Sequence, residues 1–247
     1  MRMRKKKHTA ERMKALRSLF VDYTADSPLD LAELFGNTAP VRLEIGCGKG
    51  DFIKQLSERD GGYNYIAMEK IDDVIVAAAE KYAVSRSLGR LAPNGGWQKP
   101  DGETVPMGET WDIPAELRGN VRFMRADAAC LADVFPAESV EMVYANFSDP
   151  WTKSGYASRR LTHSGFLEMY ERILTPGGLF RFKTDNTELF EYSVESVRAS
   201  SLELVFVTDD LHASEYAADN IMTEYERNFT EQGIRIHMLE ARKSDGK

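Results

Sequence analysis

Strand-like and helix-like stretches alternate along most of this chain. The apolar run VRLEI at residues 41–45 predicts a buried strand, and a glycine-rich turn and the amphipathic stretch FIKQLSE follow it directly. The same order recurs, with further strands predicted at residues 64–69, 121–127, 140–147, 179–185, 202–209 and 235–242 and helices at residues 9–35, 71–84, 161–174 and 186–200. Such alternation is typical of βαβ units. We therefore predict an α/β fold with a mostly parallel, doubly wound sheet and helices on both of its faces.

Residues 86–118 interrupt this alternation. The segment holds five of the 18 glycines and four of the nine prolines, and it shows little periodicity. It is too long for a plain connection in a compact domain. We predict an inserted polar surface loop, which is either a tolerated insertion or a flap that contacts substrate. The domain prediction is a basic N-terminal arm and helix over residues 1–40 and a single domain over residues 41–247.

The charge of the chain is unevenly distributed. Its net charge is −7, yet residues 1–20 carry eight of the 32 Lys and Arg and only one of the 39 Asp and Glu. An acidic body argues against non-specific nucleic-acid binding by the whole surface. A basic arm favours local contact with phosphates, or else it is a solvated tail.

Several classes of protein are excluded by what the sequence contains. No apolar run is long enough to cross a membrane, and the basic start lacks the apolar segment of a secretory signal. Cys47 and Cys130 lie far apart and match no metal or redox spacing. We expect a cytoplasmic protein that binds neither a membrane nor a metal, and the sequence leaves monomer and homodimer undecided.

Acidic residues stand at the ends of five predicted strands. They are Glu44, Glu69, Asp127, Asp149 and Asp185. Ligands of doubly wound sheets bind outside the carboxyl ends of the strands, so these side chains are expected at one edge. Crowded carboxylates repel one another unless a cationic or donor-rich ligand lies among them.

The glycine turn narrows the choice of ligand. Its pattern is E-x-G-x-G-x-G, and Asp51 stands where a dinucleotide fingerprint has its third glycine. An acid there disfavours a pyrophosphate, which makes an NAD-dependent oxidoreductase the least favoured alternative. S-adenosyl-L-methionine fits better, because it has no phosphate, a ribose diol for an acid to bind, and a cationic sulfonium.

The stretch NFSDPWTKSGYASRRL at residues 146–161 follows a predicted buried strand. Pro150 lacks an N–H donor, so the strand cannot continue past it and Asp149 is expected at the exposed edge. Trp151 either packs in the core or stacks beside the pocket. The cations that follow are expected to face solvent, where an RNA backbone can bind; they are Lys153, Arg159 and Arg160.

These motifs together resemble the bacterial tRNA (guanine-N7-)-methyltransferase family, which has the Rossmann-like class I methyltransferase fold. LEIGCGKGDF resembles the first motif of that family, and NFSDPWTKS with the later RRL resembles its Asp-Pro-Trp loop. KTDNTELFEYS and NIMTEYERNFTEQG are similar to its later motifs. The resemblance runs from the basic N-terminus to about residue 241, with residues 86–118 as a gap.

The resemblance implies an enzyme that uses S-adenosyl-L-methionine to methylate N7 of a guanine in the variable loop of tRNA. It implies a catalytic Asp149 between cofactor and base. The implied cofactor contacts are Glu44, Gly46, Gly48, Gly50, Glu69, Asp127 and Asp149, and the implied substrate contacts are Lys153, Asp185, Thr223, Glu224, Tyr225 and Glu226. Guanine N7 carries a lone pair and no proton, so transfer requires no general base.

The chain departs from the family pattern after the tryptophan. Thr152 stands where a proline is usual, and residues 152–158 carry fewer cations, so we expect RNA binding to depend strongly on salt. Two alternatives remain. One is a methyltransferase that acts on another substrate, which the Thr-Glu-Tyr-Glu segment disfavours. The other is a non-catalytic RNA-binding protein of the same fold, which the presence of all five strand-end acids disfavours.

Overall fold

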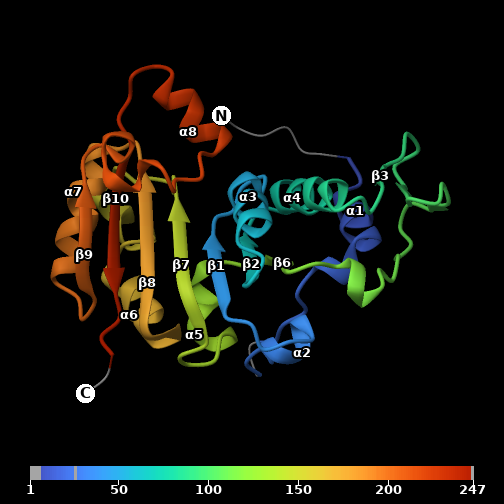
Figure 1. Ribbon diagram of the computed structural model, residues 1–247, viewed down its shortest axis with the longest axis horizontal. Coiled ribbons are helices and arrows are strands. Elements are labelled where there is room, and N and C mark those ends of the chain that lie inside the picture. Colours follow the sequence, from blue (N-terminus) through green and yellow to red (C-terminus); the bar gives the residue numbers. More distant parts are fainter. Residues whose placement is uncertain (1–6, 25–26, 246–247) are drawn as a thin grey trace. The chain divides into compact units, whose positions relative to one another are not determined.

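The predicted fold class is confirmed by the computed structural model, which describes residues 7–24 and 27–245. The main sheet has seven strands in the order β6-β2-β1-β7-β8-β10-β9 (Figure 1). Its strands are β1 Val41–Ile45, β2 Asn64–Glu69, β6 Val121–Arg125, β7 Val140–Asn146, β8 Leu174–Thr184, β9 Glu203–Thr208 and β10 His237–Arg242. Each corresponds to a strand predicted from the sequence, with ends that differ by a few residues.

The helices alternate with these strands along the chain. The α-helices are α1 Thr9–Ala15, α2 Leu31–Phe35, α3 Asp51–Arg59, α4 Asp72–Ser85, α5 Leu131–Val134, α6 Ser164–Ile173, α7 Thr187–Arg198 and α8 Glu224–Thr230. Short 3-10 helices are η1 Arg17–Leu19, η2 Ala115–Leu117, η3 Ala128–Cys130, η4 Ser154–Arg159, η5 Leu211–Ala213 and η6 Glu215–Ala217.

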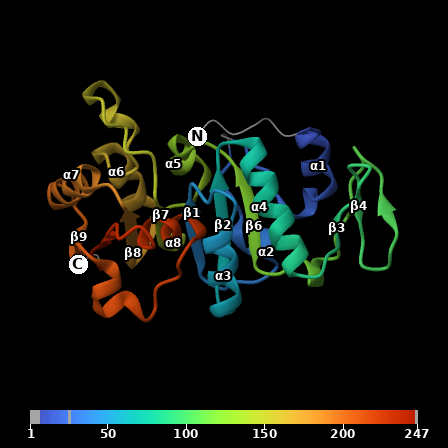
Figure 2. The ribbon, with the colours of Figure 1, turned by 90° about the horizontal axis from the view of Figure 1, so that it is seen from above.

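The described chain divides into two compact units. The first comprises the described residues up to Asp22 together with Cys47–Asp127, and the second comprises the described residues of Tyr23–Gly46 and of the segment after Asp127. In the first unit β2 and β6 pair in parallel, and α4 lies between them in the sequence (Figure 2). Its core includes Tyr82 and Phe123, whose ring centroids lie 5.8 Å apart.

The prediction of one helix over residues 9–35 is wrong. After α1 and η1 the chain becomes extended, and the amide of Val21 donates to the carbonyl of Phe123 in β6 at 2.8 Å. The apolar residues Phe20 and Val21 are buried. The edge of β6 would otherwise present unpaired backbone groups. Hydrogen bonding of Val21 to this edge therefore competes with helix formation.

The segment 86–118 is not a plain loop. It contains a three-stranded antiparallel sheet of β3 Arg90–Leu91, β4 Trp97–Gln98 and β5 Thr104–Val105. Trp97 is buried, and its indole N–H donates to the carbonyl of Leu88 at 2.8 Å. Leu88, Trp97, Val105 and Ile113 of this segment are all buried, which periodicity over such short strands does not reveal.

The second unit holds the other five strands of the main sheet. β1, β7 and β8 run parallel, whereas β10 pairs antiparallel with both β8 and β9 (Figure 1). Tyr170 of α6 is buried against Phe180 of β8, with ring centroids 4.8 Å apart. No helix in the described ranges is long and apolar enough to cross a membrane.

Candidate active site

The glycine turn after β1 presents backbone rather than side chains. The amide of Cys47 donates to the carbonyl of Met68 at 2.9 Å, and the amide of Gly48 donates to Glu69 Oε2 at 3.3 Å. Gly48 and Gly50 have φ values of +55° and +76°, which side-chain-bearing residues rarely adopt. A Cβ on Gly48 would meet no atom within 4 Å. The turn therefore has open space beside Gly48 that a ligand can occupy against bare backbone.

Two strand-end acids, Glu69 and Asp127, belong to the first unit, and Glu69 contacts the glycine turn. Glu69 Oε1 accepts from the amides of Lys70 and Ile71 at 2.8 and 3.0 Å, which fixes its carboxylate at the end of β2. Lys70 Nζ forms an ion pair with Asp127 Oδ2 at 2.9 Å. Both partners of this ion pair are largely exposed, so the pair is open to rearrangement when a ligand binds.

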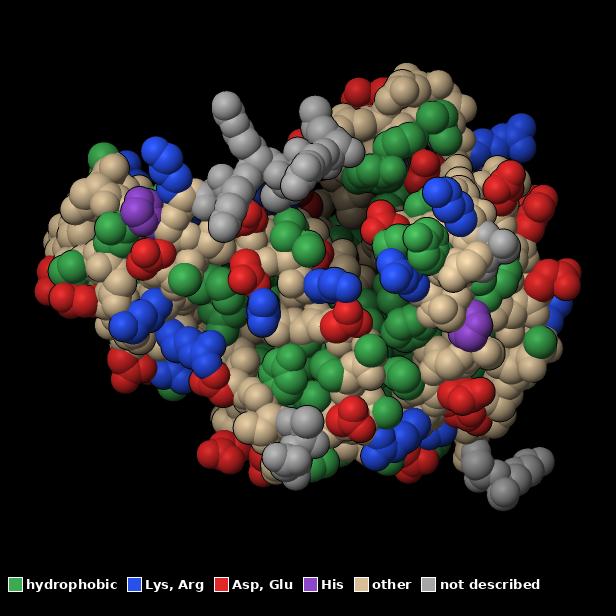
Figure 3. All heavy atoms as spheres, turned by 180° about the vertical axis from the view of Figure 1, so that it is seen from behind, with side chains coloured by type: hydrophobic (Ala, Val, Ile, Leu, Met, Phe, Trp, Pro, Cys, Tyr) green, Lys and Arg blue, Asp and Glu red, His purple; other side chains and the backbone are tan. Residues whose placement is uncertain are grey.

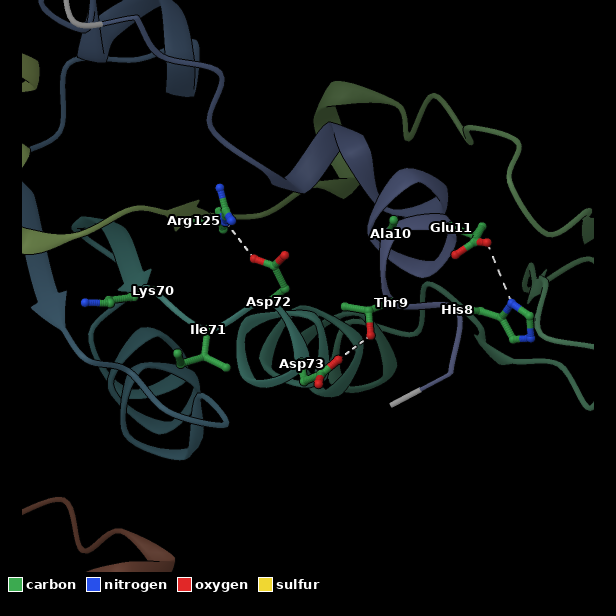
Figure 4. Close-up of a pocket in the computed structure, with 9 residues that line it drawn as sticks. All are labelled: His8, Thr9, Ala10, Glu11, Lys70, Ile71, Asp72, Asp73 and Arg125. Carbon is green, nitrogen blue, oxygen red and sulfur yellow. Dashed lines mark hydrogen bonds and ion pairs between the residues drawn. The ribbon is translucent and has the colours of Figure 1, made fainter. Parts of the chain in front are cut away.

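A pocket of the first unit lies beside Lys70 (Figure 4). Its charged groups largely pair within the pocket itself: Arg125 Nε donates to Asp72 Oδ1 at 2.6 Å, and Thr9 donates to Asp73. His8 lies 3.7 Å from Glu11. The hydrogen bond of Thr9 to Asp73 joins the start of α1 to the start of α4, and that of Arg125 to Asp72 joins β6 to α4.

In the second unit the buried polar cluster begins at Glu44 in β1. This side chain is only 2% exposed, and its Oε1 accepts from Asn146 Nδ2 at 3.0 Å. Within residues 7–24 and 27–245, Asn146 Oδ1 and Ser148 Oγ are buried without a hydrogen-bond partner. Buried polar atoms are normally paired, so these two atoms indicate a place for a ligand with polar groups. Gly46, which directly follows β1, is exposed and has φ +72°.

The Asp-Pro-Trp segment has an unusual backbone. Phe147 and Trp151 have φ values of +53° and +43°, on either side of the exposed Asp149. Non-glycine residues in this region cost about 1–3 kcal/mol each and occur mostly at functional sites. The strand itself ends at Asn146, four residues before Pro150.

Arg160 holds this segment in place. Its Nε donates to the carbonyl of Pro150 at 3.1 Å and its Nη2 to the carbonyl of Trp151 at 3.2 Å. The same guanidinium lies 4.3 Å from the ring centroid of Tyr192 in α7. Arg160 is half-buried, and its guanidinium is engaged by two carbonyls of the turn and an aromatic face and so points only partly to solvent.

Arg159 and Lys153 behave differently from Arg160. Both are exposed, and the Arg159 guanidinium lies 5.0 Å from the Trp151 ring centroid and 4.7 Å from that of Tyr156. Trp151 is half-buried and meets Tyr156 edge-on. Of the two alternatives for Trp151, packing in the core is thereby disfavoured.

The charges of Asp149 and Asp185 both act on Tyr225 in the second unit. Burial raises the pKa of the Tyr225 hydroxyl, and the charges of Asp185 and Asp149 raise it further. The Tyr225 side chain is nevertheless 46% exposed, and its ring packs against Phe147 and Phe229 at centroid distances of 5.0 and 4.5 Å. The partly exposed Tyr225 ring therefore packs on Phe147, two residues before Asp149, and both carboxylate charges act on its hydroxyl.

Glu226 is fully enclosed by protein. Its Oε2 accepts from Lys183 Nζ at 2.8 Å, and its Oε1 accepts from Asn220 Nδ2 at 2.6 Å and lies 3.2 Å from His212 Nε2. Burial lowers the pKa of Lys183, and Glu226 opposes that shift. The role of Glu226 as a substrate contact stays a prediction, and in this structure its two oxygens bind protein donors.

The neighbours of Glu226 have separate roles. Thr223 Oγ1 accepts from the amide of Glu226 at 2.9 Å and so caps α8, whereas Glu224 is exposed.

Sequence reasoning missed Asn146, Ser148 and Lys183. For Lys183 a signal was present, since a charged residue inside the apolar run LFRFKTD needs a buried partner.

Charges of both signs are interspersed on the surface. Figure 3 shows Lys and Arg side chains among Asp and Glu side chains over one face of the molecule. In the parts of the chain that the structure describes, no three His, Cys, Asp or Glu side chains are grouped so that they could hold a metal ion.

Comparison with known proteins gives a consistent result. The model of a family described as putative methyltransferase matches residues 38–239. A tRNA (guanine-N(7)-)-methyltransferase of Lachnoclostridium phytofermentans is 40% identical over 209 residues, which cover 85% of this chain and 83% of that protein. Enzymes of the same name from Listeria monocytogenes and Lactococcus lactis are 35% and 37% identical, each over 98% of both chains.

Solved structures agree at the level of the fold. An antibiotic-related methyltransferase aligns with a TM-score of 0.54 at 17% identity, covering 93% of this chain and 97% of that one. The 16S rRNA methyltransferase KamB aligns with a TM-score of 0.56 at 12% identity, covering 88% and 95%. The fold is thus that of class I methyltransferases, and with relatives this similar along nearly its whole length, the chain belongs to the tRNA (guanine-N(7)-)-methyltransferase family.

Proposed function

We propose that this protein transfers the methyl group of S-adenosyl-L-methionine to N7 of a guanine in the variable loop of tRNA. The observation that carries the proposal is the near-full-length similarity to enzymes named for this reaction. Residues 41–247 would act as one methyltransferase domain, with residues 1–40 as a basic arm that helps to bind tRNA. A tRNA substrate also favours a cytoplasmic location.

S-adenosyl-L-methionine supplies a methyl group on a positively charged sulfur when it is bound, and each unit by itself holds groups suited to part of this cofactor. In the second unit, Glu44, Asn146 Oδ1 and Ser148 Oγ are buried polar groups suited to an ammonium or hydroxyl donor. In the first unit, Glu69 would accept from the ribose hydroxyls and Asp127 from the adenine amino group. The backbone of the turn from Gly46 to Gly50 would contact the methionyl part.

The substrate side is supported by the Asp149, Asp185 and Tyr225 group. Guanine presents two adjacent donors, N1–H and the 2-amino group, and a carboxylate accepts such a pair as it accepts an arginine fork. The methylated base carries a positive charge, which nearby carboxylates stabilise as it develops. N7 has no proton to lose, so we assign to Asp149 an orienting and electrostatic role and not that of a general base.

Access to the target requires the base to leave its stack. Enzymes that modify a base take it out of the helix and hold it against aromatic side chains. The exposed ring of Tyr225 offers such a face. Lys153, which is exposed beyond the Asp-Pro-Trp turn, would contact the RNA backbone.

The test is methyl transfer from labelled S-adenosyl-L-methionine to unmodified tRNA transcripts, with the product nucleoside identified. We expect 7-methylguanosine with the wild-type protein and its loss with Asp149→Ala. A protein that binds the cofactor but methylates no RNA at low or moderate salt would contradict the proposal. In that case a methyltransferase for another substrate would be the better interpretation.

A further inference from the structure

Lys183 is a buried cation near the end of β8. Its side chain is 2% exposed, and its ammonium group donates to three acceptors. These are Glu226 Oε2 at 2.8 Å, Asn220 Oδ1 at 3.0 Å and the carbonyl of Ile221 at 3.1 Å. Three donors thus meet three acceptors, all of which belong to the segment from Asn220 to Glu226.

The backbone of the same residue holds the other substrate motif. The carbonyl of Lys183 accepts from the amide of Phe147 at 2.8 Å. Phe147 is the residue with positive φ at the start of the Asp-Pro-Trp turn, and its ring packs on Tyr225. One residue of β8 therefore contacts the turn through its backbone and the segment from Asn220 to Glu226, which includes the start of α8, through its side chain.

Burying a lysine costs free energy, so good packing alone does not explain why a lysine stands at this position. Removing an ammonium group from water is unfavourable unless good partners replace the water, and apolar residues of similar volume often serve stability as well. Such pairs are best explained where they fix one arrangement among several. Here the arrangement that is fixed is the place of Tyr225, the immediate neighbour of Glu226, beside Asp149 and Asp185.

We propose that Lys183 is a positioning residue for methyl transfer, which acts through Glu226 to hold Tyr225 beside the two carboxylates. The inference rests on the proposed function, because the group that it positions is the predicted guanine site. The Lys183 side chain is enclosed by protein, and we assign to it no contact with substrate or cofactor.

The first experiment compares Lys183→Met, Lys183→Arg and the control Arg181→Met. Arg181 lies on the same strand and pairs with the buried Glu240 at 2.9 Å, so its replacement also breaks an ion pair but leaves residues 220–226 untouched. We expect Lys183→Met to lower kcat/KM for tRNA about 100-fold, as a misplacement of about 1 Å does. Lys183→Arg should recover part of the loss, and Arg181→Met should lose stability with kcat/KM close to wild type.

A spectroscopic readout separates positioning from general loosening. The tyrosinate absorbance of Tyr225, identified by subtraction of Tyr225→Phe, should titrate at lower pH in Lys183→Met than in wild type. It should not change in Arg181→Met. If the two variants lose activity in proportion to their thermal stability, or if the Tyr225 titration stays in place in Lys183→Met, the proposal is wrong.

A double-mutant cycle tests the route through Glu226. Because the two residues act as one unit, Lys183→Met with Glu226→Gln should be no worse than the more damaged single variant. If Lys183→Met alone unfolds because Glu226 is left as an unpaired buried charge, the uncharged double variant still allows activity to be measured. Losses that multiply in the double variant would overturn the inference. Failure of the proposed function is distinguishable, since the wild-type protein would then methylate no tRNA at all.

Discussion

The glycine turn after β1 and the Asp-Pro-Trp turn after β7 are built by different means. The glycine turn is local: residues 46–50 take positive φ at three glycines, and one backbone hydrogen bond, from Cys47 to Met68, and one to the Glu69 side chain connect them to β2. The Asp-Pro-Trp turn forces positive φ on Phe147 and Trp151, which are not glycines. It therefore needs contacts from outside the turn; Arg160 and Lys183 supply them, and Tyr192 packs against the Arg160 guanidinium.

The difference indicates how each site tolerates change. A turn whose conformation is inherent in its glycines depends on those glycines and on little else. A turn held by distant side chains can be lost by a substitution that contacts neither ligand nor reacting atoms. We therefore expect mutations that act at a distance to affect the substrate side more than the cofactor side.

The largest effect is expected from Arg160→Met. Without the guanidinium, the carbonyls of Pro150 and Trp151 lose their donors and the strained turn is free to relax. We expect kcat/KM for tRNA to fall about 100-fold, because Asp149 is displaced. Cofactor affinity, measured by calorimetry, should fall much less than kcat/KM, since the glycine turn does not depend on this contact and only Ser148 and Asp149 of the proposed cofactor groups lie in the relaxed turn.

The matched control for this prediction is Arg198→Met. Arg198 is an exposed arginine on α7, the helix that carries Tyr192, and exposed substitutions usually change stability by about 0.5 kcal/mol or less. Its activity should equal that of wild type. Equal loss of cofactor and tRNA binding in Arg160→Met would break the contrast between the two turns.

Gly50→Ala probes the other side of the comparison. The new Cβ would lie 2.9 Å from the Ala78 Cβ at a φ of +76°, and the left-handed conformation alone costs about 1–2 kcal/mol. We expect a lower melting temperature and about tenfold weaker cofactor binding, which corresponds to about 1.4 kcal/mol. The kcat at saturating cofactor should change little.

A glycine without these constraints is the control for Gly50. Gly62 has no positive φ, and a Cβ there would meet no atom within 4 Å. Gly62→Ala should bind cofactor as wild type does. If both variants bind cofactor normally, the glycine turn is not the rigid local element described here.

The same distinction explains what sequence alone predicts. The seven strands, the acids at their ends and the glycine turn follow from period and local residue type, so all of the main strands were predictable. The contacts of Lys183 with Asn220 and Glu226 join residues about forty positions apart. No spacing rule predicts such a pair, although a lysine inside an apolar strand shows that a partner exists.

Two elements were mispredicted for related reasons. The extended course of Phe20 and Val21 depends on the open edge of β6, which the sequence of residues 9–35 does not contain. The small sheet within residues 86–118 depends on burial of Trp97, because strands of two residues give no periodic signal. In both cases tertiary contact outweighed local preference.

A smaller effect on tRNA binding is expected from Lys153→Ala, just after the Asp-Pro-Trp turn. Lys153 is exposed, and loss of one phosphate contact should weaken tRNA binding a few-fold and reduce the slope of log affinity against log salt by about 1. Lys54→Ala is the control, because Lys54 of α3 pairs with Glu58 at 3.0 Å. An unchanged salt slope in Lys153→Ala would show that this cation faces no phosphate.

The smallest effect concerns the titration of Tyr225. Burial and the charges of Asp185 and Asp149 raise its pKa above the usual value of about 10. The folded protein therefore holds this proton more tightly than the unfolded chain, and the stabilisation it gives is present below about pH 10 and is lost as pH rises through the raised pKa. Asp149→Asn should lower the pKa of Tyr225 measured by tyrosinate absorbance, because one of the two negative charges is removed, whereas Asp51→Asn in the first unit should leave it unchanged. Since the Tyr225 side chain is 46% exposed, solvent screens the charge and the shift will be a fraction of that for a buried pair. An identical titration in Asp149→Asn and wild type would mean that the carboxylate and the ring are too far apart to bind one base together.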